Sequence, residues 1–208
     1  LFSKLFIQYL NGTPLNTIHE TILSYYDWAK NYMQPLSLYE NYLDFFTTLY
    51  KNKKGFNERI NLNFNSNDTY FNASANLKLI MYNFYTNQFE KSLPLIPKIN
   101  LNASTGPWFF AFKYYQSLTY GFLALKYSNK KYLTQFKRSS KIYFRLKKVK
   151  EFKLFNISNL LSLIECLNNN KLDKALVLYN KIDHDHINLV AVANEALGIY
   201  FKNKQIKI

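Results

Sequence analysis

Residues 169–179 read NNKLDKALVLY, a polar turn followed by an amphipathic helix. Ala175 is small enough to let a second helix approach closely, and the aromatic Tyr179 follows one helical turn later. Residues 197–201 read LGIYF on a further helical segment, where Gly198 again predicts a tight helix crossing. The polar residues 203–205 then repeat the kind of turn that opens the quoted stretch. The C-terminal part of the chain is therefore predicted to consist of helices joined by short polar turns.

These two segments resemble the tetratricopeptide repeat, a helix–turn–helix unit of about 34 residues with small and aromatic residues at fixed places. Ile206 follows Leu172 by 34 residues, and the resemblance covers roughly the last 50 residues, although the usual Trp and Pro positions of the repeat are not filled. The resemblance implies stacked antiparallel helical hairpins, an α-solenoid that binds other proteins. The same residues also resemble the pentatricopeptide repeat, a related helical hairpin that implies binding to single-stranded RNA.

Fainter echoes of the turn and the following helix begin at Phe89 and at Tyr132. Measured from Phe89 to Tyr132 and from Tyr132 to Leu172, the units would be 43 and 40 residues long. These echoes predict earlier units that are longer and less regular than the last one.

Apolar residues recur at helical spacing along most of the chain, which predicts an all-α fold. The predicted helices cover residues 7–10, 17–32, 39–50, 72–85, 108–127, 133–150, 159–167, 172–182 and 189–202. Residues 57–67 alternate apolar and polar side chains like a short strand, but their many Asn residues favour an irregular loop. Only 5 Gly and 5 Pro are present, which disfavours a many-stranded β fold with frequent tight turns. We expect one domain over residues 1–208, with an irregular helical part over 1–70 and helical hairpins over 71–208.

The positive charge is concentrated in one quarter of the chain. The formal net charge is +14, and residues 101–150 hold eleven of the 27 Lys and Arg residues and none of the 13 acidic ones. Lys137, Lys141, Arg145 and Lys148 recur at spacings of four, four and three residues, which places them on one face of the helix predicted over 133–150. This pattern predicts a basic amphipathic helix that binds a polyanion: nucleic-acid phosphate first, then an anionic membrane surface, then an acidic protein. The alternative is a solvated face in a Lys-rich chain. The predicted binding residues are Lys126, Lys130, Lys131, Lys137, Arg138, Lys141, Arg145, Lys147, Lys148 and Lys150.

A dense aromatic run lies just before this helix, at residues 108–115, and follows Gly106-Pro107, a typical helix start. Exposed aromatic side chains beside a basic helix could stack on nucleic-acid bases. Because the chain contains 18 Tyr and 18 Phe, we expect these rings to pack in the core instead.

The sequence lacks the motifs of the common enzyme classes, including a phosphate-binding loop, a dinucleotide fingerprint, a nucleophile elbow and a zinc-protease helix. Cys166 lies on the apolar side of its helix and is expected to be a structural thiol. Residues 183–186 read DHDH, but adjacent residues on one short loop rarely complete a metal site, so we expect helix capping there. No enzyme activity, cofactor or metal is predicted.

A single cysteine excludes an internal disulfide framework and indicates an intracellular, reducing compartment. The excess of Phe, Tyr, Asn, Lys and Ile is typical of an AT-rich genome, which makes a mitochondrion or another organelle one expectation. No apolar run reaches the roughly 20 residues of a transmembrane helix. Leu1 in place of Met predicts a processed chain or part of a longer repeat protein.

Two functions follow from these observations. The first is a non-catalytic scaffold or adaptor that binds proteins within a larger assembly. The alternative is an RNA-binding component, either pentatricopeptide-like or a subunit of an organellar ribosome, that uses the basic helix over 126–150.

Overall fold

The computed structural model describes residues 8, 13–32, 36–51, 69–99, 107–146 and 155–205, and its regular structure in these ranges is entirely helical. The all-α prediction is therefore confirmed for the described residues. In chain order the elements are α2 (Leu15–Asn31), α3 (Leu36–Tyr50), α5 (Thr69–Tyr85), α6 (Phe89–Ser92), the 3-10 turn η1 (Ile96–Lys98), α7 (Pro107–Tyr127), α8 (Lys130–Leu146), α9 (Phe155–Asn168), α10 (Leu172–Tyr179) and α11 (Ile187–Gln205).

Each helix predicted between residues 17 and 202 is present, with described ends displaced by at most four residues. The predicted segment 57–67, residues 147–150 of the basic helix and most of 7–10 lie outside the described residues. Helices such as α8 and α9 begin earlier than predicted because apolar periodicity becomes visible only after the first turn.

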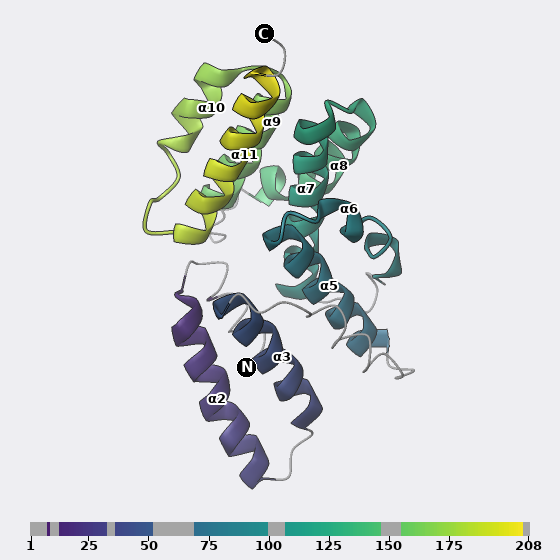
Figure 1. Ribbon diagram of the computed structural model, residues 1–208, viewed down its shortest axis with the longest axis vertical. Coiled ribbons are helices and arrows are strands. Elements are labelled where there is room, and N and C mark those ends of the chain that lie inside the picture. Colours follow the sequence, from purple (N-terminus) through teal and green to yellow (C-terminus); the bar gives the residue numbers. More distant parts are fainter. Residues whose placement is uncertain are drawn as a thin grey trace.

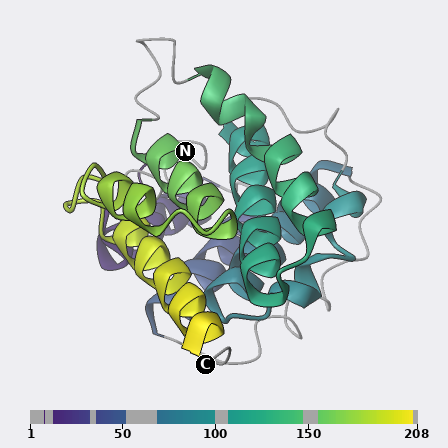
Figure 2. The same cartoon turned by 90° about the horizontal axis from the view of Figure 1, so that it is seen from above.

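The helices pack in pairs of chain neighbours, and the longer members of successive pairs touch one another. α2 packs on α3, α7 on α8, and α9 on α10. In addition, α5 contacts α7, α7 contacts α9, and α9 contacts α11. The α2–α3 pair lies at one end of the molecule and α10 and α11 lie towards the other (Figure 1). Seen along the long axis, α7 and α8 lie on one side and α9 to α11 on the other (Figure 2).

The same left-handed turn follows α5, α7 and α9. Asn87, Ser128 and Asn170 have φ of 57°, 50° and 56°, and they are separated by 41 and 42 residues. After α5 and α9 the next backbone N–H bonds back to the helix, from Gln88 to the Asn83 carbonyl (2.7 Å) and from Lys171 to the Cys166 carbonyl (2.8 Å). This is the Schellman arrangement, in which a left-handed residue ends a helix and satisfies its last carbonyls.

The buried positions around these turns also recur. The positions ten, six and three residues before each left-handed residue are apolar and at most 5% exposed: Leu77, Met81 and Phe84; Leu118, Phe122 and Leu125; Leu160, Ile164 and Leu167. The position five residues after it packs inward as Ser92, Leu133 and Ala175. Counted from the left-handed residues, Lys130 holds the same place as Phe89 and Leu172, as the first residue of the following helix.

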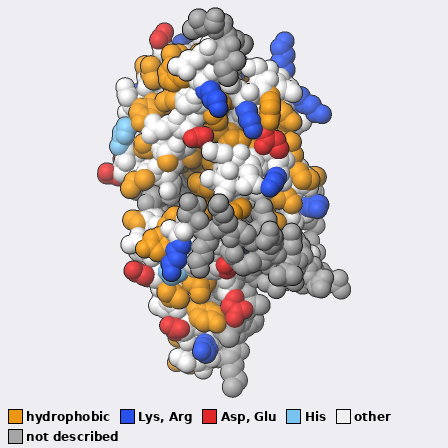
Figure 3. All heavy atoms as spheres, in the orientation of Figure 1, with side chains coloured by type: hydrophobic (Ala, Val, Ile, Leu, Met, Phe, Trp, Pro, Cys, Tyr) orange, Lys and Arg blue, Asp and Glu red, His pale blue; other side chains and the backbone are white. Residues whose placement is uncertain are grey.

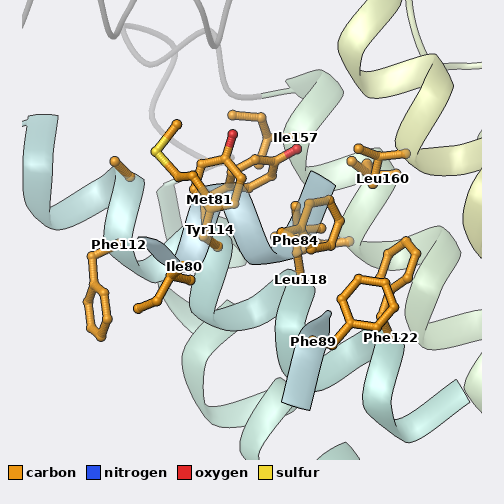
Figure 4. Packing of buried hydrophobic residues seen from close by; sticks show 14 of the residues in the cluster. Ile80, Met81, Phe84, Phe89, Phe112, Tyr114, Leu118, Phe122, Ile157 and Leu160 are labelled. Atoms are coloured by element: carbon orange, nitrogen blue, oxygen red, sulfur yellow. The ribbon is translucent and has the colours of Figure 1, made fainter. Parts of the chain in front are cut away.

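Rings from three helices meet in the core. Phe84 of α5 lies 5.1 Å from Phe122 of α7, and Phe89 of α6 lies 5.2 Å from the same ring, measured between centroids. Figure 4 shows these rings converging between the helices. Phe112, Tyr114 and Tyr115 are at most 2% exposed, which confirms core packing for this part of the aromatic run in α7.

A close helix approach occurs at Gly121, in the middle of α7. A Cβ atom at this position would lie 2.8 Å from Ile164 Cγ2 of α9 and 3.0 Å from the Phe136 ring of α8. The tight crossing predicted at Gly198 is wrong, because nothing lies within 4 Å of its Cβ position and the residue is exposed. The fully buried Ala175 agrees with the close approach predicted for α10.

We expect Gly121→Ala to destabilise the chain by about 1–3 kcal/mol, because the added methyl group overpacks the junction of α7, α8 and α9 by more than the gain in helix propensity. Gly198→Ala is the matched control. Its methyl group meets open space, so it should stabilise α11 by up to about 1 kcal/mol. Urea unfolding followed by circular dichroism measures both changes, and equal effects of the two substitutions would contradict the close approach at Gly121.

Candidate functional site

The basic residues of α8 lie on the side of the helix that faces solvent. The opposite side is buried through Phe136, Ser139, Ser140 and Tyr143. Ser139 accepts a hydrogen bond from Ser117 of α7 (2.9 Å), and Tyr143 donates one to the Phe110 carbonyl. These contacts fix the rotation of α8 and therefore the direction in which its charged side chains point.

Seven of the ten predicted binding residues are described, and all seven are exposed. They are Lys126, Lys130, Lys131, Lys137, Arg138, Lys141 and Arg145. Lys147, Lys148 and Lys150 lie outside the described residues. Lys and Arg side chains are visible in the upper right part of Figure 3, over α7 and α8.

Five exposed residues of α8 form one line along the helix, which we call the basic stripe: Lys130, Thr134, Lys137, Lys141 and Arg145. Their spacings of four, three, four and four residues keep them on one face. Arg138 and Lys131 lie beside the stripe and widen it. The stripe therefore carries four positive charges and no negative one.

Two of the seven described binding residues form ion pairs with other described residues. Lys137 Nζ lies 3.5 Å from Glu165 Oε1 of α9, with both side chains substantially exposed. Lys126 Nζ lies 2.6 Å from Glu90 Oε1, and Tyr127 also donates to this carboxylate. Partial desolvation opposes ionisation of Glu90, but these two hydrogen bonds outweigh it and lower its pKa to about 2. Lys126 thus joins α7 to α6. Apart from Lys137, the exposed cations of α8 form no ion pair within the described residues.

A pocket of about 420 Å³ lies at the first residue of the basic stripe. It is lined by the last turns of α7, α9 and α11 and by the first turn of α8, including Lys130. Its apolar lining comes from Ala124, Leu125, Leu133, Leu167 and Tyr200. Sequence reasoning missed this pocket, because its walls combine α7 and α8 with α9 and α11, which come later in the chain.

Asparagine amides hold the walls of this pocket in place. Asn168 Nδ2 donates to the Gly121 carbonyl (3.2 Å) and to the Ile164 carbonyl (3.0 Å), which joins α9 to α7. Asn203 Nδ2 donates to the Leu125 carbonyl (2.6 Å), which joins α11 to α7. Both N–H groups of Asn168 are therefore used inside the protein, and its side-chain oxygen can only accept a hydrogen bond.

The DHDH loop at residues 183–186 and Cys166 do not form a metal site or a reactive nucleophile in the described structure. Asp183 and His186 lie 3.7 Å apart, and Asp183 Oδ1 accepts from the Asp185 backbone N–H in a local turn. In the part of the chain that the structure describes, no three His, Cys, Asp or Glu side chains are grouped so that they could hold a metal ion. Cys166 is half-buried, and burial followed by the nearby Glu165 charge raises the pKa of its thiol. This thiol is therefore a poor nucleophile.

Lys78 is a buried cation that sequence reasoning missed, although its position in the apolar run LKLIM was a usable signal. It lies on α5, is 3% exposed, and places Nζ 3.7 Å from the ring centroid of Tyr42 on α3. Burial lowers the pKa of Lys78 to about 7, against the opposing effect of the Asp44 carboxylate. Lys78 therefore lies at the contact between α5 and the α2–α3 pair.

Comparison of the chain with protein-family models, curated proteins and solved structures found no match. Within the described residues, no helix is both long and apolar enough to cross a membrane.

Lys78 predicts a pH dependence of stability. Its folded pKa of about 7 lies below the unfolded value of about 10.4, so between these values the unfolded chain binds one proton more. The free energy of unfolding should therefore rise with pH from 7 to 9, by up to about 1.4 kcal/mol per pH unit from this group. Lys78→Met should remove this contribution, whereas Lys91→Met at an exposed position should not. Parallel pH profiles of wild type and Lys78→Met in urea unfolding would contradict the burial of a titrating lysine.

Proposed function

We propose that the chain is a non-catalytic scaffold or adaptor, which binds other proteins of a larger assembly on a row of stacked helical hairpins. The observation that carries this proposal is the recurrence, at separations of 41 and 42 residues, of a left-handed turn with the same buried positions around it. Units that recur in this way stack on their neighbours and expose an extended surface, which suits protein binding and needs no preformed active site.

The order of helix contacts supports this arrangement. α5, α7, α9 and α11 contact one another in succession, and α6, α8 and α10 each pack on the longer helix that precedes them. Stacked antiparallel hairpins of a tetratricopeptide-like solenoid have this order, and the direct contact of α11 with α7 departs from it. The separations of 41 and 42 residues exceed the usual length of about 34, so the units would be lengthened ones.

The exposed apolar side chains provide surface for protein partners. Tyr25, Trp28 and Tyr32 form a line along α2, at spacings of three and four residues, and Trp28 and Tyr32 are 49% and 62% exposed. Their rings lie 4.9 Å apart. Leu176 and Val177 are exposed on α10. Apolar side chains are also visible over α2 and α3 in the lower part of Figure 3. Large exposed aromatic side chains are common anchors of protein interfaces.

The buried ionisable groups with shifted pKa values favour a structural role over a catalytic one, and the partly exposed Glu90 owes its low pKa, against partial desolvation, to its bonds with Lys126 and Tyr127. Burial raises the pKa values of Tyr114 and Tyr143, and both side chains are at most 2% exposed. Lys78 is buried to a similar degree. These groups are packed in the core, where no substrate can reach them.

The scaffold proposal predicts specific protein crosslinks. A photoreactive phenylalanine analogue in place of Trp28, and in a second variant in place of Val177, should crosslink defined proteins when the chain is expressed in its native cells. Mass spectrometry of the crosslinked bands identifies them. Adding Tyr25→Ser and Tyr32→Ser should lower the yield at position 28 at least about fivefold, because these side chains flank the probe, and should leave the yield at 177 unchanged. Crosslinks indistinguishable from those of an unrelated helical protein would reject the scaffold.

RNA binding is the second candidate function, and the exposed basic stripe is the observation that favours it. Such binding predicts steep weakening with salt, since each phosphate contact releases a counterion. Replacing Lys137, Lys141 and Arg145 together with Gln should reduce the magnitude of the log–log salt slope by about 2 for a single strand. Titration with a fluorescent oligouridylate at several salt concentrations measures this slope, and an unchanged slope would exclude the stripe as an RNA site.

A further inference from the structure

We propose that the basic stripe and the pocket at its first residue form one docking site for an acidic protein segment, with one apolar side chain of that segment seated in the pocket. This inference rests on the scaffold function and names the chemistry of one partner. The two parts are continuous, because Lys130 both begins the stripe and lines the pocket.

The charge of the stripe is complementary to an acidic occupant. Neighbouring cations at four-residue spacing repel one another by a few tenths of a kcal/mol per pair. Glu165 is the one described acidic side chain that pairs with the stripe, through Lys137. Lys130, Lys141 and Arg145 have no acidic partner within the described residues, so carboxylates from outside the chain would relieve their repulsion.

The pocket suits an apolar side chain of a peptide. Leu125, Leu133 and Leu167 supply apolar lining within a rim of Ser, Asn and Lys residues, and the Asn168 and Asn203 hydrogen bonds hold α7, α9 and α11 around it. Asn168 lines the pocket and has used both of its N–H groups, so the polar atom left on its side chain is an oxygen that can accept from a peptide N–H. A phosphate group carries acceptors only and gains nothing from that oxygen.

The surroundings of the stripe favour a protein over single-stranded RNA. Nonspecific binding of a single strand relies on exposed aromatic side chains on which bases stack. The ring of Tyr114 on α7 and the rings of Phe136 and Tyr143 on the inner side of α8 are buried. Among the residues of α7 and α8 whose side chains the structure describes, Tyr127 is the one exposed aromatic residue, and its hydroxyl is bonded to Glu90. Tyr132 and Phe144 of α8 are half-buried.

The length of the stripe sets the length of the acidic segment. Lys130 and Arg145 are 15 residues apart on a helix, which corresponds to about 22 Å at about 1.5 Å per residue. An extended peptide at about 3.3 Å per residue covers this distance with about seven residues. An acidic run of about seven residues beside an apolar residue therefore matches both parts of the site.

The test is fluorescence polarisation on the full chain, at about 0.15 M salt, with three labelled probes. The first is a run of seven Glu flanked by Leu at both ends, which covers either direction of binding. The second has Ser in place of both Leu residues. The third is an oligouridylate of equal charge. We expect the Leu-flanked peptide to bind at least about tenfold more tightly than the Ser-flanked peptide and than the oligouridylate.

Variants assign the binding to the two parts of the site. Replacing Lys137, Lys141 and Arg145 with Gln should weaken both peptides at least about tenfold. Replacing the exposed Lys171, Lys174 and Lys181 with Gln is the matched control and should change affinity less than about twofold. Leu133→Gln should remove the advantage of the Leu-flanked peptide and leave the Ser-flanked peptide unaffected. Circular dichroism checks that each variant folds.

Three results would overturn the proposal: equal affinity for the Leu-flanked and Ser-flanked peptides, tighter binding of the oligouridylate, or no binding of either peptide. Protein crosslinks from positions 28 and 177 in the absence of peptide binding would reject this docking site alone and leave the scaffold function standing. Absence of both the protein crosslinks and the peptide binding would reject the docking site and the scaffold function together.

Discussion

The described fold depends on the close contact at Gly121. There α7 meets Phe136 of α8 and Ile164 of α9 at distances that leave no room for a Cβ atom. α7 also contacts α5, α6 and α11, so any displacement of this helix would separate most of the other elements. The adjacent Phe122 carries the ring contacts to Phe84 and Phe89, which join α7 to the preceding pair. One residue without a side chain and the aromatic residue after it therefore determine how three successive helix pairs fit together.

At the left-handed turns this glycine-poor chain ends its helices with Asn and Ser residues. A helix that ends in a left-handed residue usually has glycine there, because glycine lacks the Cβ atom that makes this conformation unfavourable. This chain has only 5 glycines and uses Asn87, Ser128 and Asn170 instead. Asparagine tolerates the left-handed region better than other residues with a side chain. The abundance of Asn thus has a structural use at these turns, whatever its origin in codon usage.

The functional proposals rest on the contrast between the two sides of α8. One side is buried through Phe136 and Tyr143, and this contact directs the cations of the other side into solvent. The same packing forms the pocket, because the first turn of α8 meets the last turns of α7, α9 and α11 there. Charge and apolar surface are therefore combined at one place by the way in which the helix pairs stack. By contrast, Lys126 is held by Glu90 and serves mainly to join α6 to α7.

The sequence by itself determined the helices and the exposed face of α8, because the apolar spacing that forms a helix also decides which of its faces is buried. It predicted a tight crossing at Gly198, where there is none, and missed the one at Gly121, because a glycine does not reveal which helix lies opposite it. It also missed the burial of Lys78 and the pocket beside Lys130. Both depend on contacts between residues far apart in the chain. Local periodicity carries no information about such contacts, and only the packing of the helices decided them.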